Sequence, residues 1–228
     1  MGELYIVATP IGNLGDITLR ALEVLKSVDF ILSEDTRVSQ KLLNHYGIKK
    51  TLIAYHQHSL EVVEQKLIKL LAEDKKLALV TDAGTPGVSD PGGRLIEVVL
   101  KANPETKIIP IPGASALTTL ISVAGVKLDH FLFLGFLPHK KGRQTLLKEI
   151  AKSDQPIIVY ESKHRLLKLL DELNALIPKT ELIIGRELTK MHETIYRGTA
   201  DTISKILKAQ PLAQKGEFVL IINQYGQK

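Results

Sequence analysis

Nine short apolar runs, separated by segments with helical spacing, constrain the fold of this chain more than any other feature. Each run is continuous rather than alternating, which is typical of strands buried on both faces of a sheet. Two of the helical segments have well-placed ends: Ser59 can cap the segment that follows it, and Gly47 follows Ser39–Tyr46 as a C′ glycine does. The alternation predicts an α/β fold with mainly parallel sheets. The apolar runs are Leu4–Ala8, Phe30–Leu32, Leu52–Ala54, Leu77–Val80, Ile108–Ile111, Phe131–Phe136, Ile157–Tyr160, Leu182–Ile184 and Phe218–Ile222. Helical spacing is clearest at Leu60, Val63, Leu67 and Leu70 and at Leu166, Leu170, Leu173 and Ile177.

The chain has 228 residues, enough for one large domain or two modest ones. Five strand–helix units precede Pro112, and the strands resume with longer, charged connectors at Phe131. We therefore place a domain boundary between these two residues. It divides the chain into an N-terminal α/β domain, residues 1–115, and a C-terminal α/β domain, residues 116–228.

Composition excludes several kinds of chemistry. The absence of cysteine rules out disulfides, Cys-ligated zinc, iron–sulfur clusters and a thiol nucleophile. No apolar run approaches the ~20 residues of a membrane span, and no basic segment with a cleavage site precedes the first predicted strand. We expect a cytoplasmic protein. The net charge of +5 is compatible with a polyanionic partner but is also common in proteins that bind no nucleic acid.

Four loops that follow predicted strands are rich in glycine, proline and small polar residues. In an open parallel sheet, ligands bind outside the carboxyl ends of the strands, where these loops would meet. One such loop would be read as an ordinary turn, but four at one edge indicate a binding site. The loops are Thr9–Asn13, Ser33–Arg37, Thr81–Gly93 and Pro112–Ala116.

The loops lack the signatures of two common nucleotide sites. There is no G-x-G-x-x-G after the first strand and no G-x-x-x-x-G-K-[ST], which disfavours a dinucleotide fold and a P-loop. Glycines without a neighbouring lysine suggest close backbone approach to an uncharged or zwitterionic ligand. The amides of Gly113–Ala116 open a helix and could bind a carboxylate, while Asp82 and Asp90 could face an amino or ribose group. S-adenosylmethionine, an amino-acid-bearing nucleoside, matches both needs.

Eight motifs extend this pattern over nearly the whole chain. They are Val7–Asn13, Ser33–Arg37, Val80–Gly92, Pro110–Ala116, Gly135–Pro138, Tyr160–Arg165, Gly185–Glu193 and Lys215–Glu217. In this order they resemble the ribosomal RNA small subunit methyltransferase I family. The chain departs from the family at Lys163, where proline is usual, and it ends at Lys228, where many members continue into a short helical tail.

The resemblance implies a two-domain tetrapyrrole-methylase fold, with a mainly parallel sheet in the N-terminal domain and a mixed sheet in the C-terminal domain. S-adenosylmethionine would lie in the cleft between the domains. The implied reaction is 2′-O-methylation of a cytidine ribose, cytidine 1402, in 16S ribosomal RNA, as free RNA or in the 30S subunit, by a homodimer. The implied donor-binding residues are Pro10, Gly12, Asp82, Ala83, Gly84, Thr85, Val88, Ser89, Pro112, Gly113, Ala114, Ser115 and Ala116.

A ribose hydroxyl is a poor nucleophile, so a base that takes its proton typically adds ~10²–10⁴-fold to the rate. The candidate bases are Glu34, Asp35, Glu161, Glu187, Lys190 and His192. We select Glu34, Asp35, Arg37 and Lys190 as the catalytic set. Asp35 could orient substrate, or it could be a capping carboxylate paired with Arg37. Lys190 or Arg186 could stabilise a developing alkoxide, or they could belong to a surface ion-pair network.

Two basic segments, one after the domain boundary and one after the strand at Ile157–Tyr160, are candidate contacts for RNA phosphates. Such contacts are salt-sensitive, and the alternative is a solvated surface. The histidines show no metal-ligand spacing with a carboxylate partner, so we expect no metal. The candidate RNA contacts are Lys140, Lys141, Arg143, His164, Arg165 and Arg186.

Two rival functions stay open. One is methylation of a tetrapyrrole or a protein side chain by an enzyme of the same fold. The other is a non-catalytic, RNA-binding ribosome-assembly protein. The acidic motif Ser33–Arg37 and the basic connectors favour RNA over a tetrapyrrole, and the donor-loop glycines favour an enzyme.

Overall fold

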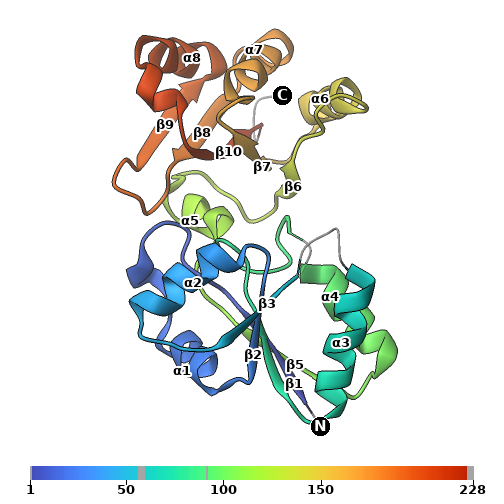
Figure 1. Ribbon diagram of the computed structural model, residues 1–228. Coiled ribbons are helices and arrows are strands. Elements are labelled where there is room, and N and C mark those ends of the chain that lie inside the picture. Colours follow the sequence, from blue (N-terminus) through green and yellow to red (C-terminus); the bar gives the residue numbers. More distant parts are fainter. Residues whose placement is uncertain (1, 56–59, 91, 225–228) are drawn as a thin grey trace. The chain divides into compact units, whose positions relative to one another are not determined.

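The chain divides into two compact units, which are described separately. The structure is a computed structural model that describes residues 2–55, 60–90 and 92–224 (Figure 1). The units are Met1–Ser115 and Ala116–Lys228. The predicted cap Ser59 lies outside the described residues.

The first unit contains a five-stranded sheet in the order β3-β2-β4-β1-β5, and every neighbouring pair is parallel. The central strand β1 pairs with β4 on one side and β5 on the other, so that Leu4 lies opposite Leu77 and Ile108. The predicted parallel sheet of the N-terminal domain is therefore confirmed. The strands are β1 (Glu3–Val7), β2 (Phe30–Ser33), β3 (Thr51–Ala54), β4 (Lys76–Leu79) and β5 (Lys107–Ile111).

Helices cover both faces of this sheet, as expected for strands with continuous apolar sequences. Figure 1 shows α1 and α2 on one side and α3 and α4 on the other. On the first side Leu25 and Leu43 pack with Ile31, and on the second Leu67 and Leu95 pack with other sheet residues. The short helix η1 (Leu14–Asp16) precedes the four covering helices α1 (Leu19–Ser27), α2 (Thr36–His45), α3 (Leu60–Ala72) and α4 (Gly92–Ala102).

The second unit contains a mixed five-stranded sheet in the order β6-β7-β10-β8-β9. Strands β6 and β7 are parallel, and the other three pairs are antiparallel, which confirms the predicted mixed sheet. The strands are β6 (Leu132–Phe136), β7 (Ile157–Ser162), β8 (Glu181–Arg186), β9 (Thr194–Thr199) and β10 (Glu217–Asn223). The helices are α5 (Ala116–Val123), α6 (Arg143–Lys152), α7 (Leu166–Leu176), α8 (Ala200–Ala209) and η2 (Pro211–Gln214).

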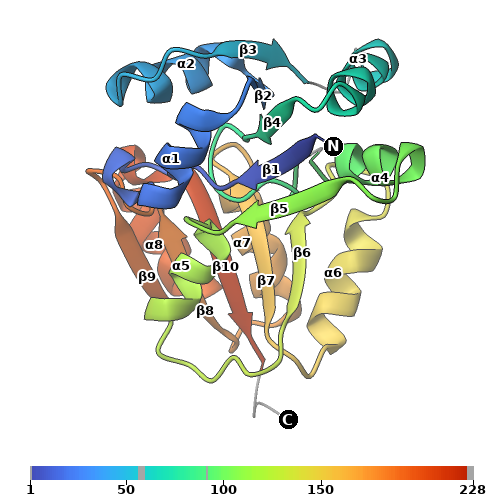
Figure 2. The same cartoon turned by 90° about the horizontal axis from the view of Figure 1, so that it is seen from below.

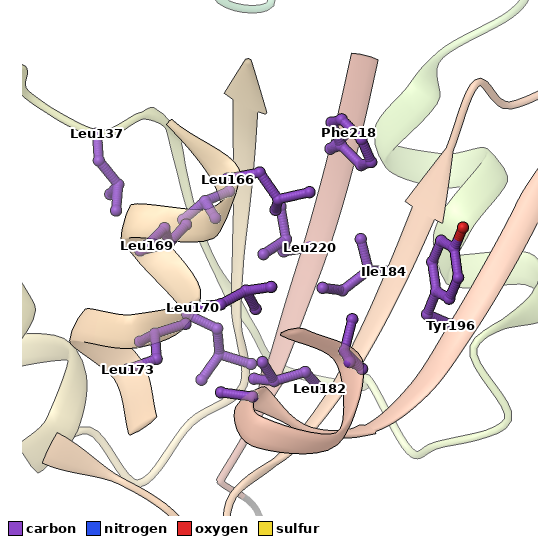
Figure 3. Packing of buried hydrophobic residues seen from close by; sticks show 14 of the residues in the cluster. Leu137, Leu166, Leu169, Leu170, Leu173, Leu182, Ile184, Tyr196, Phe218 and Leu220 are labelled. Atoms are coloured by element: carbon purple, nitrogen blue, oxygen red, sulfur yellow. The ribbon is translucent and has the colours of Figure 1, made fainter. Parts of the chain in front are cut away.

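The core of this unit lies between the sheet and its helices. Figure 2 shows α7 and α8 behind the sheet and α5 in front of it. Leucines of α7, including Leu166 and Leu170, point toward Ile184 and Leu220 of the sheet (Figure 3). On the other face, a Cβ atom added to Gly185 would lie 3.0 Å from Leu120 of α5, so glycine permits the close approach of helix and strand.

Strand β9 was not predicted from the sequence. Its residues Thr194–Thr199 mix polar and apolar side chains instead of forming an apolar run. The strand lies at the edge of the sheet and pairs only with β8, so it needs to bury fewer side chains than a central strand. The edge strand β3 of the first sheet is also less buried than its run of apolar residues predicts.

Candidate functional site

The four predicted loops meet at one edge of the first sheet, because the parallel strands that they follow all end there. Thr9, after β1, and Gly84, after β4, exchange two backbone hydrogen bonds, with N···O distances of 2.9 and 3.0 Å. The Thr9 hydroxyl also donates to the Thr81 carbonyl at 3.0 Å. The first and third loops are therefore joined by both backbone and side-chain contacts.

Side chains connect the remaining loops to the same group. The Thr85 hydroxyl donates to the Ala114 carbonyl at 3.1 Å, which ties the loop after β4 to the loop after β5. The Asp82 carboxylate accepts a hydrogen bond of 3.0 Å from the Asp35 backbone N–H, which ties the loop after β2 to the loop after β4. All four loops thus form one hydrogen-bonded group.

Glycine is required where these loops approach each other. Gly84 has a φ of +86°, and a Cβ atom there would lie 3.4 Å from Ile11. A Cβ atom on Gly113 would lie 3.0 Å from the Ala8 Cβ atom. Among the predicted donor residues, Pro10 and Gly84 are buried. The exposed ones are Gly12, Asp82, Ala83, Ser89, Pro112 and Gly113, and the half-buried ones are Thr85, Val88, Ala114, Ser115 and Ala116.

Asp90 organises the turn that leads into α4. Its Oδ1 atom accepts hydrogen bonds from the backbone N–H groups of Gly87 and Gly92, both at 2.7 Å. A Cβ atom on Gly92 would lie only 2.8 Å from the Gly87 nitrogen, so the turn needs glycine there. Asp90 was expected to face a ligand. The structure corrects this expectation for its Oδ1 atom, which accepts hydrogen bonds from within the loop instead.

A small, open pocket lies beside these loops. It is lined by Glu34, Tyr55, Leu79, Val80, Thr81, Pro86, Asp90 and Gly92. Tyr55 is almost fully buried and donates to Glu64 at 3.2 Å, and Arg94 donates to the same carboxylate at 3.0 Å. Burial, and then the negative charge of Glu64, raise the pKa of Tyr55. Sequence reasoning missed the contacts among Tyr55, Glu64 and Arg94, because these residues form no motif and Arg94 is 30 residues away from Glu64.

Asp35 and Arg37, both predicted to be catalytic, form a capping pair at the start of α2. Asp35 accepts from the Arg37 backbone N–H at 2.9 Å, and the two side chains form an ion pair of 2.6 Å. The hydrogen bonds from the Arg37 guanidinium and from its N–H lower the pKa of Asp35 to about 2. A carboxylate this acidic is a poor proton acceptor at neutral pH. Asp35 therefore acts as a capping carboxylate at the start of α2. Glu34, by contrast, is exposed and lines the pocket.

Lys190 lies in the second unit, in the loop between β8 and β9. Its Nζ atom is 3.0 Å from the carboxylates of both Glu187 and Glu217. Burial opposes the charged form of Lys190, but the hydrogen bonds that its Nζ atom donates to these two carboxylates together outweigh this effect, and the pKa of Lys190 is raised. Lys190 is therefore a cation rather than a base. Burial also opposes ionisation of Glu187, but the Glu217 N–H and Lys190 together lower the pKa of Glu187.

The structure corrects three of the expected RNA contacts. Arg143 is only 3% exposed and pairs with Glu172 at 2.6 Å. Arg186 donates to the carbonyls of Lys215, His192 and Leu212, and Arg165 pairs with buried Glu161 at 2.7 Å. These guanidinium groups are committed to partners within the fold. Only Lys140, Lys141 and His164 of the expected set are exposed.

Within residues 2–55, 60–90 and 92–224, no group of three or more His, Asp or Glu side chains is arranged to hold a metal ion. None of the helices described there combines the length and apolar character needed to cross a membrane.

Comparisons with known proteins extend the sequence resemblance. A family model described as tetrapyrrole (corrin/porphyrin) methylases matches residues 3–204. A Synechocystis sp. protein named ribosomal RNA small subunit methyltransferase I is 47% identical, with 97% of this chain and 79% of that protein aligned. A protein of the same name from Thermotoga maritima is 43% identical, with 98% and 99% aligned. The crystal structure of diphthine synthase has a TM-score of 0.73 at 16% identity, covering 97% of this chain and 90% of that one, which is a likeness of fold alone.

Proposed function

Because this chain belongs to the tetrapyrrole methylase family, and within it to the group named ribosomal RNA small subunit methyltransferase I, we propose that it methylates ribosomal RNA. The methyl donor is S-adenosylmethionine, and the acceptor is the 2′-hydroxyl of a cytidine ribose, cytidine 1402, in 16S ribosomal RNA. The observation that carries this proposal is the single hydrogen-bonded group formed by four small-residue loops at one sheet edge.

The loop residues fit the proposed donor. Gly84 and Gly113 allow the loops to approach one another closely, and the exposed Asp82 carboxylate can face a ribose or amino group. The donor's carboxylate would lie at the N-terminus of α5, near Ser115 and Ala116, where backbone N–H groups favour an anion. When bound, the donor supplies a methyl group on a sulfonium, which is a good leaving group.

The protein's own residues have the task of placing the ribose hydroxyl and managing its charge. Alignment of two reacting groups can contribute several kcal/mol to the rate. Glu34 is the exposed carboxylate at the pocket, so it serves to orient the hydroxyl or accept its proton. Lys190 is a fixed cation, and it serves to stabilise negative charge that develops on the oxygen.

We expect Glu34→Ala and Lys190→Ala to lower the rate of methyl transfer by about 10²-fold or more while binding of S-adenosylmethionine persists. Lys190→Arg is the matched variant, because it keeps the charge between Glu187 and Glu217. Single-turnover rates measured beside calorimetric donor affinities separate chemistry from binding. Full activity in both alanine variants would remove these two residues from the mechanism.

The RNA partner is the small-subunit ribosomal RNA, free or within the assembled 30S subunit. The exposed residues Lys140, Lys141 and His164 are the proposed phosphate contacts. We also propose that the protein is a homodimer, and analytical ultracentrifugation would measure its oligomeric state.

The proposal is tested by transfer of a tritiated methyl group from S-adenosylmethionine to small subunits that lack the modification. A porphyrin precursor is offered in parallel as the alternative acceptor. Transfer to the subunits alone supports the proposal, and transfer to the porphyrin alone identifies a tetrapyrrole methylase. If calorimetry detects no donor binding, the chain is a non-catalytic RNA-binding protein instead.

A further inference from the structure

Phe136 is a large aromatic side chain that remains 53% exposed at the end of β6. The pairing of β6 with β7 shifts register between Phe133 and Gly135, and Gly135 has a φ of +60°. A bulge of this kind redirects the side chains that follow it. The Phe136 ring packs edge-on against Tyr160, with centroids 5.6 Å apart. The ring is thus supported from one side and exposed to solvent on the other.

Two basic loops begin at the same edge of this sheet. Strands β6 and β7 are parallel, so the segments after Phe136 and after Ser162 leave the sheet at neighbouring points. Lys140 and Lys141 are exposed in the first segment, and Lys163 is exposed in the second. Among the described residues, none of these three lysines has an ion-pair partner. Their charges are therefore available to an anionic partner.

A buried ion cluster fixes both segments. Arg165 pairs with Glu161, which is 1% exposed, and donates to the Leu137 carbonyl at 2.8 Å. The Glu161 carboxylate also accepts from the Ser162 backbone N–H at 2.8 Å. Arg143, also buried, donates to the Pro138 carbonyl at 3.2 Å. The cluster therefore holds the first residues of both segments beside Phe136.

We propose that Phe136 and the two segments beside it bind a single-stranded part of the RNA substrate. A base stacks on the exposed face of Phe136, and its flanking phosphates contact Lys140, Lys141 and Lys163. Glu161 is a positioning residue that acts through Arg165. Unstacked bases on aromatic rings beside basic groups are the common mode of single-strand recognition. The inference rests on the proposed function, because that function supplies the RNA.

The test measures binding of a fluorescent single-stranded 16S RNA segment by anisotropy. Loss of one base–aromatic stack weakens binding about 5- to 150-fold, so Phe136→Ala should fall in this range and Phe136→Tyr should stay near wild type. Leu132→Ala is the matched control, because Leu132 is 45% exposed at the opposite end of the same strand. Donor affinity should be the same in all three variants.

The positioning role has its own readout. Glu161→Gln should reduce the slope of log K against log salt by about 0.7 for each phosphate contact that is lost, and Glu161→Asp should restore part of it. A wild-type slope in Glu161→Gln, with donor binding intact, contradicts the positioning role.

Two results would overturn the assignment of Phe136. One is unchanged RNA affinity in Phe136→Ala. The other is a change in the oligomeric state of the Phe136→Ala variant, seen by sedimentation, that accounts for any loss of affinity. The ring would then lie in a contact between two copies of the chain. Either result leaves the proposed function standing if the wild-type protein still methylates 16S RNA. If the wild-type protein transfers no methyl group to RNA, the proposed function itself fails.

Discussion

At the residue scale, Asp35 shows how local contacts fix the charge of one carboxylate. Its pKa lies at about 2, compared with an ordinary value of 3.8, because Arg37 donates to it from both side chain and backbone. A carboxyl group whose pKa is lower in the folded state than in the unfolded state stabilises the fold at pH values above its unfolded-state pKa. That stabilisation is lost as the pH falls toward the folded value. For Asp35 the contribution is complete at neutral pH and declines between about pH 4 and pH 2.

Removal of the guanidinium should raise the pKa of this carboxyl. We expect Arg37→Gln to shift it upward from about 2, though not fully to 3.8, because the backbone N–H remains a donor. Carbon-13 NMR of the Asp35 carboxyl measures the shift. Lys41→Gln is the control, because Lys41 is also exposed on α2 but does not contact Asp35. Equal titration curves in wild type and Arg37→Gln would contradict the assigned cause.

Alanine substitutions at two glycines should distinguish the cost of backbone strain from the cost of a steric clash. Gly125 has a φ of +72° with open space around it, so Gly125→Ala should cost about 1 kcal/mol of unfolding free energy. Gly216 has a φ of +115°, and a Cβ atom there would lie 2.5 Å from the Glu187 side chain. Gly216→Ala should therefore cost at least about 2 kcal/mol in urea unfolding. Adding Glu187→Ala should recover only the steric part, and equal costs at the two glycines would refute the distinction.

At the element scale, the two basic segments after β6 and β7 should dominate the salt dependence of RNA binding. The double variant Lys140→Ala/Lys141→Ala should lower the slope of log K against log salt by about 1.4, or about 0.7 per contact. Lys179→Ala is the control, because exposed Lys179 precedes β8 and thus lies at the opposite edge of the sheet. A slope unchanged by the double substitution would exclude these segments from the RNA contact.

Elements with a local sequence signal could be predicted, and elements defined by distant partners could not. Each of the nine apolar runs overlaps a strand and extends at most one residue beyond it, and Gly47 follows α2 with a φ of +64° as predicted. Strand β9 was missed because an edge strand needs no apolar run. Arg143 was expected at the surface because its partner Glu172 is 29 residues away, and no motif connects the two.

The candidate site divides in the same way. The convergence of the four loops follows from parallel strands and short connections, both of which the sequence indicates. The roles of individual side chains depend on hydrogen bonds that spacing does not reveal. Asp35 was left open between catalysis and capping, and the structure shows the capping pair with Arg37. The Tyr55–Glu64 contact was not foreseen at all.

At the scale of the whole molecule, each unit has hydrophobic clusters of its own. The second unit is centred on residues such as Leu170, Ile184 and Leu220, which share no cluster with the first unit. Leu220→Ala should cost about 2–5 kcal/mol through the cavity that it leaves. Hydrogen exchange should accelerate in β6–β10 much more than in β1–β5. The matched variant Leu25→Ala should give the reverse pattern, and equal acceleration of both sheets in either variant would show that the units unfold together.

We propose that this chain methylates a cytidine ribose of 16S RNA. The most direct measurement is mass spectrometry of the nucleosides released from small-subunit RNA after incubation with the protein and labelled S-adenosylmethionine. We predict that the label appears in 2′-O-methylcytidine at a single position. Label found on a cytosine ring, on another nucleoside, or nowhere in the RNA would contradict this proposal.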